Sequence, residues 1–161
     1  MNRTRIALEV NGRPMEAWAS PGESLLDVLR SQAGATEVKL GCGEGVCGTC
    51  TVLLDGDPVN ACLIFAVQAD GAHVTTVRGL PEAEGELHPL QRSFLEHAGS
   101  QCGFCTPGMI VTAHWYVAGH PHPTREEVRT ALAGNLCRCT GYTKILDAVE
   151  AYATGEVGDD G

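Results

Sequence analysis

The sequence of 161 residues has no long hydrophobic run. A membrane-spanning helix needs about eighteen or more consecutive apolar residues, and no such stretch occurs. Residues 1–10 alternate polar and apolar side chains, so they lack the continuous apolar core of a signal peptide. We therefore expect neither membrane insertion nor export, and we expect a cytoplasmic, reducing environment.

Basic and aromatic residues are also scarce. The chain has 11 Lys and Arg against 20 Asp and Glu, a formal net charge of −9. It lacks the basic patch of a nucleic-acid-binding protein, so nucleic acid is not expected as a partner. Aromatic residues make up only 5% of the sequence. Two small domains with so little aromatic surface would each need a staple such as a metal site.

Cysteine, by contrast, is abundant, with eight in the chain. In a reducing compartment cysteines are more often metal ligands than disulfide partners. One group of four lies in the first half of the chain and another in the second half, which indicates two metal sites. The two groups are Cys42, Cys47, Cys50 and Cys62, and Cys102, Cys105, Cys137 and Cys139.

The first half of the chain mixes strand and helix patterns. Apolar residues alternate with polar ones before and after Asn11-Gly12, which predicts a β-hairpin. Ser24 is placed to cap a short helix with a leucine-rich face. This pattern predicts a small α+β domain. Its predicted parts are a glycine- and cysteine-rich loop at 41–50 and strands at 51–54 and 73–77, within residues 1–79.

The composition changes from residue 80 onward. Residues 80–87 are acidic and have little apolar content, so we interpret them as a linker. Residues 88–154 have helical periodicity, and residues 155–161 form an acidic tail that we expect to be disordered. Three further helix starts are predicted from capping patterns. They lie at Thr106-Pro107, Thr124 and Thr140.

The first cysteine group has the spacing C-x4-C-x2-C, followed after eleven residues by a fourth cysteine. This is the plant-type ferredoxin spacing for a [2Fe-2S] cluster. Glycines surround these cysteines, so the backbone can wrap closely and direct N–H groups at the sulfurs. Zinc sites usually have two short C-x2-4-C pairs instead, although a zinc-stapled binding module stays an alternative at this point.

The second group, C-x2-C and C-x-C, is less diagnostic and alone would also fit zinc or a thioredoxin-like pair. Cys105 directly precedes one predicted helix start, and Cys139 directly precedes the predicted Thr140 cap. Two helix N-termini would direct N–H groups and positive dipole ends at one site, which suits an anionic thiolate cluster. Arg138 would add positive charge there, or form a surface salt bridge.

Five segments carry a family resemblance. They are Lys39-Leu40-Gly41-Cys42-Gly43-Glu44-Gly45-Val46-Cys47-Gly48-Thr49-Cys50, Ala61-Cys62-Leu63, His88-Pro89-Leu90-Gln91, Gln101-Cys102-Gly103-Phe104-Cys105-Thr106-Pro107-Gly108-Met109 and Gly134-Asn135-Leu136-Cys137-Arg138-Cys139-Thr140-Gly141-Tyr142. With these segments the chain resembles the iron–sulfur subunit of the molybdenum hydroxylases, the family of xanthine dehydrogenase, aldehyde oxidoreductase and aerobic carbon monoxide dehydrogenase. The resemblance covers nearly the whole chain.

The resemblance implies a ferredoxin-like β-grasp domain followed by a four-helix bundle, each holding one [2Fe-2S] cluster through its four cysteines. The cluster of the helical domain would lie nearer the molybdopterin (the proximal cluster), and that of the first domain nearer the FAD (the distal cluster). The family pattern also implies that Gln101 and the backbone of Cys139 contact the pterin.

The resemblance further implies an electron-transfer subunit that performs no catalysis alone. It would pass single electrons from the molybdopterin centre through both clusters to FAD. The expected partners are a large molybdopterin-binding subunit and a medium FAD-binding subunit, as a dimer of heterotrimers. A free-standing two-cluster electron carrier is the alternative. The substrate and the final electron acceptor stay open, because the family binds them outside this subunit.

Overall fold

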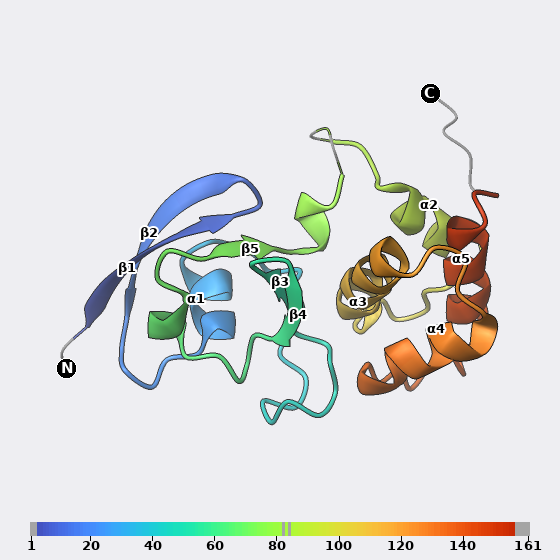
Figure 1. The fold of residues 1–161 in the computed structure, drawn as a ribbon. Helices are drawn as coiled ribbons and strands as arrows, with labels where there is room; N and C mark the ends of the chain where they lie inside the picture. Colours follow the sequence, from blue (N-terminus) through green and yellow to red (C-terminus); the bar gives the residue numbers. More distant parts are fainter. Residues whose placement is uncertain (1–2, 82, 84, 157–161) are drawn as a thin grey trace.

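The computed structural model describes residues 3–81, 83 and 85–156. Figure 1 shows a sheet with one helix beside it, followed along the chain by a group of helices. Each of these two parts has its own cluster of buried apolar side chains. The mixed α and β structure agrees with the fold class predicted from the sequence.

The sheet has five strands in the order β2-β1-β5-β3-β4. β1 pairs with β2 antiparallel and with β5 parallel. The predicted hairpin is confirmed, because Val10 pairs with Arg13 and both residues of the Asn11-Gly12 turn have a positive φ. The strands are β1 (Thr4–Val10), β2 (Arg13–Ala19), β3 (Thr51–Leu54), β4 (Asp57–Asn60) and β5 (His73–Thr75).

One helix of the first part packs beside the sheet. α1 (Leu25–Ser31) begins after Ser24, whose hydroxyl accepts a hydrogen bond of 3.1 Å from the backbone N–H of Asp27. Asp27 completes a capping box with Ser24, so the predicted cap is confirmed. The buried leucines and valine of α1 join the first core. Two short 3-10 helices follow later, η1 (Ala66–Ala69) and η2 (Val77–Gly79).

The second part is helical. The predicted cap at Thr124 is confirmed, because its side chain accepts from the N–H of Glu127 in a capping box. The cap predicted at Thr106 is wrong by one residue, because Cys105 is the N-cap and Thr106 is the first helical residue. The helices are α2 (Pro89–Glu96), α3 (Thr106–Gly119), α4 (Arg125–Ala131), η3 (Leu132–Gly134) and α5 (Thr143–Ala153).

Thr140 does not cap the last helix, in contrast to the sequence prediction. Gly141 and Tyr142 both have a positive φ, so the chain turns sharply before α5 begins at Thr143. The hydroxyl of Thr140 accepts a hydrogen bond of 3.1 Å from the N–H of Tyr142 instead. Cys139 therefore does not lie at a helix N-terminus.

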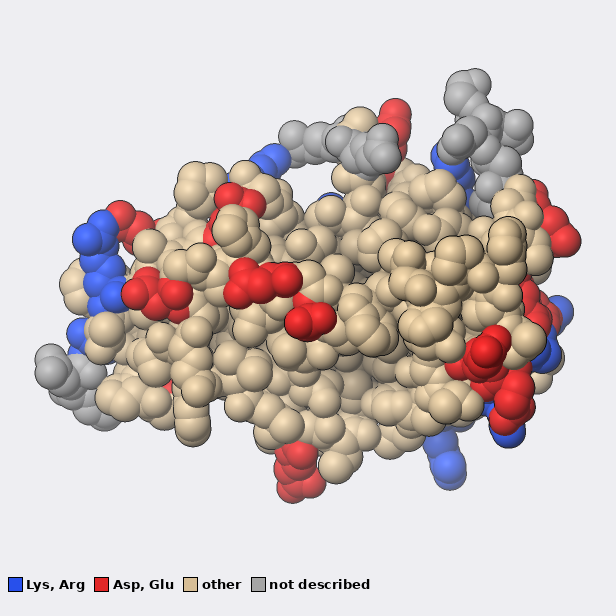
Figure 2. Space-filling view, viewed as in Figure 1, with Lys and Arg blue, Asp and Glu red and all other residues tan. Residues whose placement is uncertain are grey.

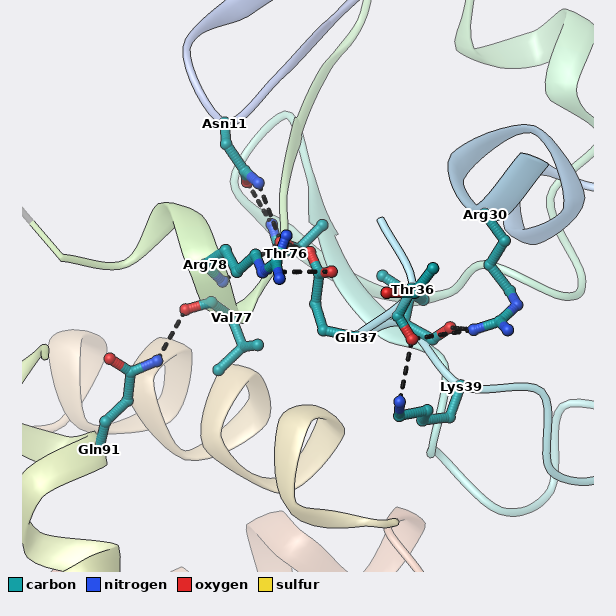
Figure 3. A network of polar contacts seen from close by, with 10 residues as sticks. Asn11, Arg30, Thr36, Glu37, Lys39, Thr76, Val77, Arg78 and Gln91 are labelled. Carbon is teal, nitrogen blue, oxygen red and sulfur yellow. Dashed lines mark hydrogen bonds and ion pairs between the residues drawn. The ribbon is translucent and has the colours of Figure 1, made fainter. Parts of the chain in front are cut away.

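The two parts are packed against each other. Leu53, Val77 and Leu80 belong to the core of the helical part, although they precede its first helix. A polar network at the same junction, drawn in Figure 3, links the chain after β5 to α2, where Gln91 donates a hydrogen bond of 2.9 Å to the carbonyl of Val77. Burial and hydrogen bonds thus fix the helical part against the sheet part.

No helix in the described part of the chain is long and apolar enough to cross a membrane. Figure 2 shows acidic side chains in scattered groups on the face drawn, separated by surface without charged residues. Two residues of the predicted linker, Glu82 and Glu84, and residues 157–161 of the predicted tail lie outside the described residues.

Two candidate metal centres

The first cysteine group lies mainly in the loop over residues 41–50, here called the first loop, between α1 and β3. The sulfur of Cys42 contacts that of Cys47, and the sulfur of Cys50 contacts that of Cys62, which follows β4. The structure thus brings the four predicted residues together as two contacting pairs. Cys50 is buried, and the other three are partly exposed.

The surroundings of Cys42 and Cys50 shift the pKa values of the two thiols in opposite directions. The backbone N–H of Glu44 lies 3.3 Å from the sulfur of Cys42, and this contact, together with the side chain of Cys47, lowers the pKa of Cys42 to about 6. Burial raises the pKa of Cys50 to about 12. N–H groups directed at the sulfurs are the feature that stabilises negative charge on an iron–sulfur cluster.

Glycine is required in the first loop for a close contact. A Cβ atom on Gly41 would lie 2.9 Å from the sulfur of Cys47, closer than carbon and sulfur approach without a shift. The glycine-rich composition therefore lets the backbone pass directly over a candidate ligand, as expected from the sequence.

The second group joins two distant segments. Cys102 and Cys105 precede α3, whereas Cys137 and Cys139 lie in residues 135–142, here called the second loop, before α5. The sulfurs of Cys102 and Cys139 lie 3.5 Å apart, and Cys105 contacts Cys137. Cys102 and Cys139 are exposed, and the other pair is partly buried. The four residues again form two contacting pairs.

Hydrogen bonds and burial also shift the pKa values of the second group in different directions. The N–H of Phe104 lowers the pKa of Cys102, and burial raises the pKa of Cys105 to about 12. The contact with Cys102 raises the pKa of Cys139. At Cys137, burial acts to raise the pKa, but hydrogen bonds from Thr140, Cys139 and Cys105 together lower it, and Thr140 contributes through its hydroxyl at 3.1 Å and its N–H at 3.5 Å. Thr140 supports a sulfur rather than a helix.

The paired sulfurs fit the group that the sequence predicts. A [2Fe-2S] cluster is held by four cysteines, two on each iron. Each group supplies two contacting pairs, with backbone N–H groups beside one member of a pair. Among the described residues, no three His, Cys, Asp or Glu side chains are placed to hold one metal ion.

Comparisons with known proteins match one domain family to each half of the chain. A family described as "2Fe-2S iron-sulfur cluster binding domain" matches residues 8–73, and one described as "[2Fe-2S] binding domain" matches residues 76–150. The nicotinate dehydrogenase small FeS subunit of Eubacterium barkeri is 49% identical over 149 residues, which cover 92% of this chain and 94% of that protein. The chain belongs to the iron–sulfur subunits of the molybdenum hydroxylases.

Other members of the molybdenum hydroxylase family have similar identities to this chain. The nicotine 6-hydroxylase small subunit of Paenarthrobacter nicotinovorans is 47% identical over 98% of this chain and 94% of its own length. In a crystal structure of quinoline 2-oxidoreductase from Pseudomonas putida 86, one chain is 47% identical, with a TM-score of 0.92 over 97% of this chain and 96% of that chain. The fold of this iron–sulfur subunit is thus shared over nearly its full length.

Two other residues of the iron–sulfur subunit were singled out from the sequence. Gln101 lies exposed directly before Cys102, and Arg138 lies exposed between the two cysteines of the second loop. Sequence reasoning gave no role to Asn135, which is only 4% exposed and lies two residues before Cys137. A buried polar side chain needs a partner, but nothing in the sequence says which one.

Proposed function

We propose that each group of four cysteines holds one [2Fe-2S] cluster in the electron-transfer subunit of a molybdenum hydroxylase. The observation that carries this proposal is the pairing of sulfurs within each group, which matches two protein ligands on each iron. The ligands are Cys42, Cys47, Cys50 and Cys62 for one cluster, and Cys102, Cys105, Cys137 and Cys139 for the other.

When bound, the clusters supply one-electron transfer, so the two electrons of a hydroxylation can leave the molybdopterin centre singly toward FAD. The chain contributes hydrogen bonds and burial at the sulfurs. The N–H groups of Glu44 and Phe104 stabilise negative charge on Cys42 and Cys102, and such bonds adjust cluster potentials.

The second group belongs on the molybdopterin side in this proposal. The exposed sulfurs of Cys102 and Cys139 support it, because a partner can approach them directly. Phe104 and Leu136 beside them are 47% and 53% exposed, and such apolar side chains favour cover by another subunit. We assign the pterin contacts to Gln101 and the backbone of Cys139.

The first group belongs on the FAD side. Three apolar side chains stand exposed around it, which supports cover by another subunit here as well. They are Leu40 at 55%, Val46 at 61% and Leu63 at 56%. A medium FAD-binding subunit would cover this face.

The full assembly that we propose has a large molybdopterin-binding subunit, a medium FAD-binding subunit and this chain, as a cytoplasmic dimer of heterotrimers. The relatives named as small subunits support partners of this kind. In the same proposal α2 to α5 form the four-helix bundle of the family, and the sheet with α1 forms the β-grasp. A free-standing electron carrier is not favoured, because the relatives are subunits of larger enzymes.

The test is purification of the complex from its native source. Two distinct [2Fe-2S] signals in electron paramagnetic resonance (EPR) spectra of the reduced protein, with about four irons in each small subunit, are the expected result. A colourless protein with stoichiometric zinc would contradict the cluster assignment. Elution of this chain without partners in size-exclusion chromatography would instead favour the free carrier.

A further inference from the structure

The two cysteine loops are hydrogen-bonded to each other through their backbones. The N–H of Leu136 in the second loop donates a bond of 2.9 Å to the carbonyl of Cys47 in the first loop. Leu136 directly precedes Cys137, so this single bond joins a proposed ligand of one cluster to the residue next to a proposed ligand of the other.

The buried side chain of Asn135 stabilises this contact between the two loops. Its buried side-chain amide donates a bond of 2.9 Å to the carbonyl of Gly48 and lies 3.4 Å from the hydroxyl of Thr51. The hydroxyl of Thr51 donates a bond of 2.6 Å to the same carbonyl. Gly48 follows Cys47 directly, so the amide fixes the first loop next to the atom that Leu136 contacts.

The backbone of Asn135 is anchored on its other side. The hydroxyl of Tyr142 donates a bond of 3.2 Å to the carbonyl of Asn135 and accepts a bond of 2.9 Å from the N–H of Cys137. Asn135 is therefore held to the second loop by its backbone and to the first loop by its side chain.

Two glycines make the approach possible. A Cβ atom on Gly48, which has φ +64°, would lie 2.4 Å from the carbonyl oxygen of Gly134. A Cβ atom on Gly108 in α3 would lie 2.4 Å from the carbonyl oxygen of Gly48. Only residues without a side chain leave room for backbones this close, so the contact depends on both positions.

We propose that Asn135 is a positioning residue for electron transfer between the two clusters, because its amide keeps the hydrogen bond between Leu136 and Cys47 closed. This inference rests on the proposed function. The bond completes a route from the sulfur of Cys137 to the sulfur of Cys47 through bonds of three residues, without a jump through empty space. With both clusters bound, one electron would leave the cluster held by Cys137 and reduce the cluster held by Cys47.

The variant Asn135→Asp in the assembled complex tests the proposal. Aspartate has nearly the same shape but lacks the N–H donor, and its carboxylate would face the carbonyl of Gly48. We expect both EPR signals and the full iron content to remain. The spin–spin splitting between the reduced clusters should change, and electron equilibration between them should become slower, because opening the hydrogen bond between Leu136 and Cys47 replaces a bonded step by a jump through space.

Asn60→Asp is the matched control. Asn60 also donates its amide to a carbonyl of the first loop, that of Gly45 at 2.9 Å, but it does not reach the second loop. The control should keep the wild-type splitting and equilibration rate. Equal effects of the two variants would overturn the proposal, because Asn135 would then only stabilise the first loop.

Gly108→Ala is a second variant, for use if Asn135→Asp does not assemble. Its methyl group displaces the carbonyl of Gly48 without touching a cysteine, so it should change the splitting and the rate in the same direction. Wild-type values in either assembled variant with both clusters would overturn the inference. Absence of two clusters in the wild-type complex would instead refute the proposed function.

Discussion

The hydroxyl of Thr76 donates a hydrogen bond of 2.7 Å to the carboxylate of Glu37, although 39 positions separate the two residues. Thr76 is only 1% exposed. Its hydroxyl also accepts a bond of 3.0 Å from the amide of Asn11, and its own N–H donates one of 2.8 Å to the oxygen of the same side chain (Figure 3). The chain leaving β5 is thus tied to the hairpin turn and to the segment after α1.

Thr76→Val should lower the free energy of unfolding of the iron-loaded chain by about 1–3 kcal/mol. Valine keeps the shape of threonine but removes the hydroxyl, so the Glu37 carboxylate and the Asn11 amide each lose a buried partner. Urea unfolding followed by circular dichroism measures the change. Thr4→Val, at an exposed position in β1, is the control, and equal midpoints for the two variants would contradict the prediction.

Cys105→Ser should remove one EPR-active cluster, about half of the iron and the turnover of the complex. The signal of the other cluster should persist, because Cys105 contacts only sulfurs of the second group. Cys47→Ser is the reciprocal variant and should spare the signal that Cys105→Ser removes. Loss of both signals in either variant would show that the two sites are not independent.

Removal of iron should unfold both parts of the chain. Each part is small, and each cluster would join segments that are distant in sequence, such as those of Cys102 and Cys139. Helical circular dichroism and visible absorbance should therefore fall together when a chelator is added. Iron loss with unchanged helical signal would show that the apolar cores suffice without the clusters.

His88 should make the helical part less stable in mild acid. Burial lowers its pKa to about 4, with smaller contributions from His114 and Arg92, and its ring lies 4.8 Å from that of His114 and 5.5 Å from that of Tyr152. Burial also lowers the pKa of His114. Because an unfolded histidine has a pKa of about 6.5, the unfolded chain binds more protons between about pH 6.5 and 4. The free energy of unfolding of the helical part is therefore highest above this pH range and decreases as the pH falls through it.

His88→Asn tests this dependence without removing the cap. Asparagine can accept the hydrogen bond that the N–H of Leu90 donates to Nδ1 of His88, but it does not titrate. The difference in urea midpoint between neutral pH and about pH 5 should shrink in this variant, measured with iron content monitored. The exposed His122→Asn should leave the difference unchanged.

The turn and the helix caps that depend on particular residue types were predicted correctly from the sequence, except for the caps at Thr106 and Thr140. The turn at Asn11-Gly12 and the capping boxes at Ser24 and Thr124 depend on neighbouring residues only, so the sequence contains them in full. β4 was not predicted. It contains Pro58, which suits an edge strand but weakens the strand pattern, and it forms by pairing with β3.

The sequence predicts two groups of four cysteines, and the structure brings each group together, but the surroundings of the two sites were not predicted. Thr140 has the residue type of a cap, and only the left-handed backbone at Gly141 and Tyr142 directs it to a cysteine instead. Asn135 could not be assigned, because its partner at Gly48 lies 87 positions away and depends on how the two parts pack. Contacts of this kind follow from tertiary structure.

The separation of the buried residues into two cores has a consequence for folding during synthesis. The buried residues of the first core run from Ile6 to Val74, so none of them comes from α2 to α5. The second core, by contrast, includes Leu53 of β3. During synthesis from the N-terminus the sheet part, with α1, can therefore fold before α2 to α5 leave the ribosome. The helices that are made later can then pack against the apolar side chain of Leu53.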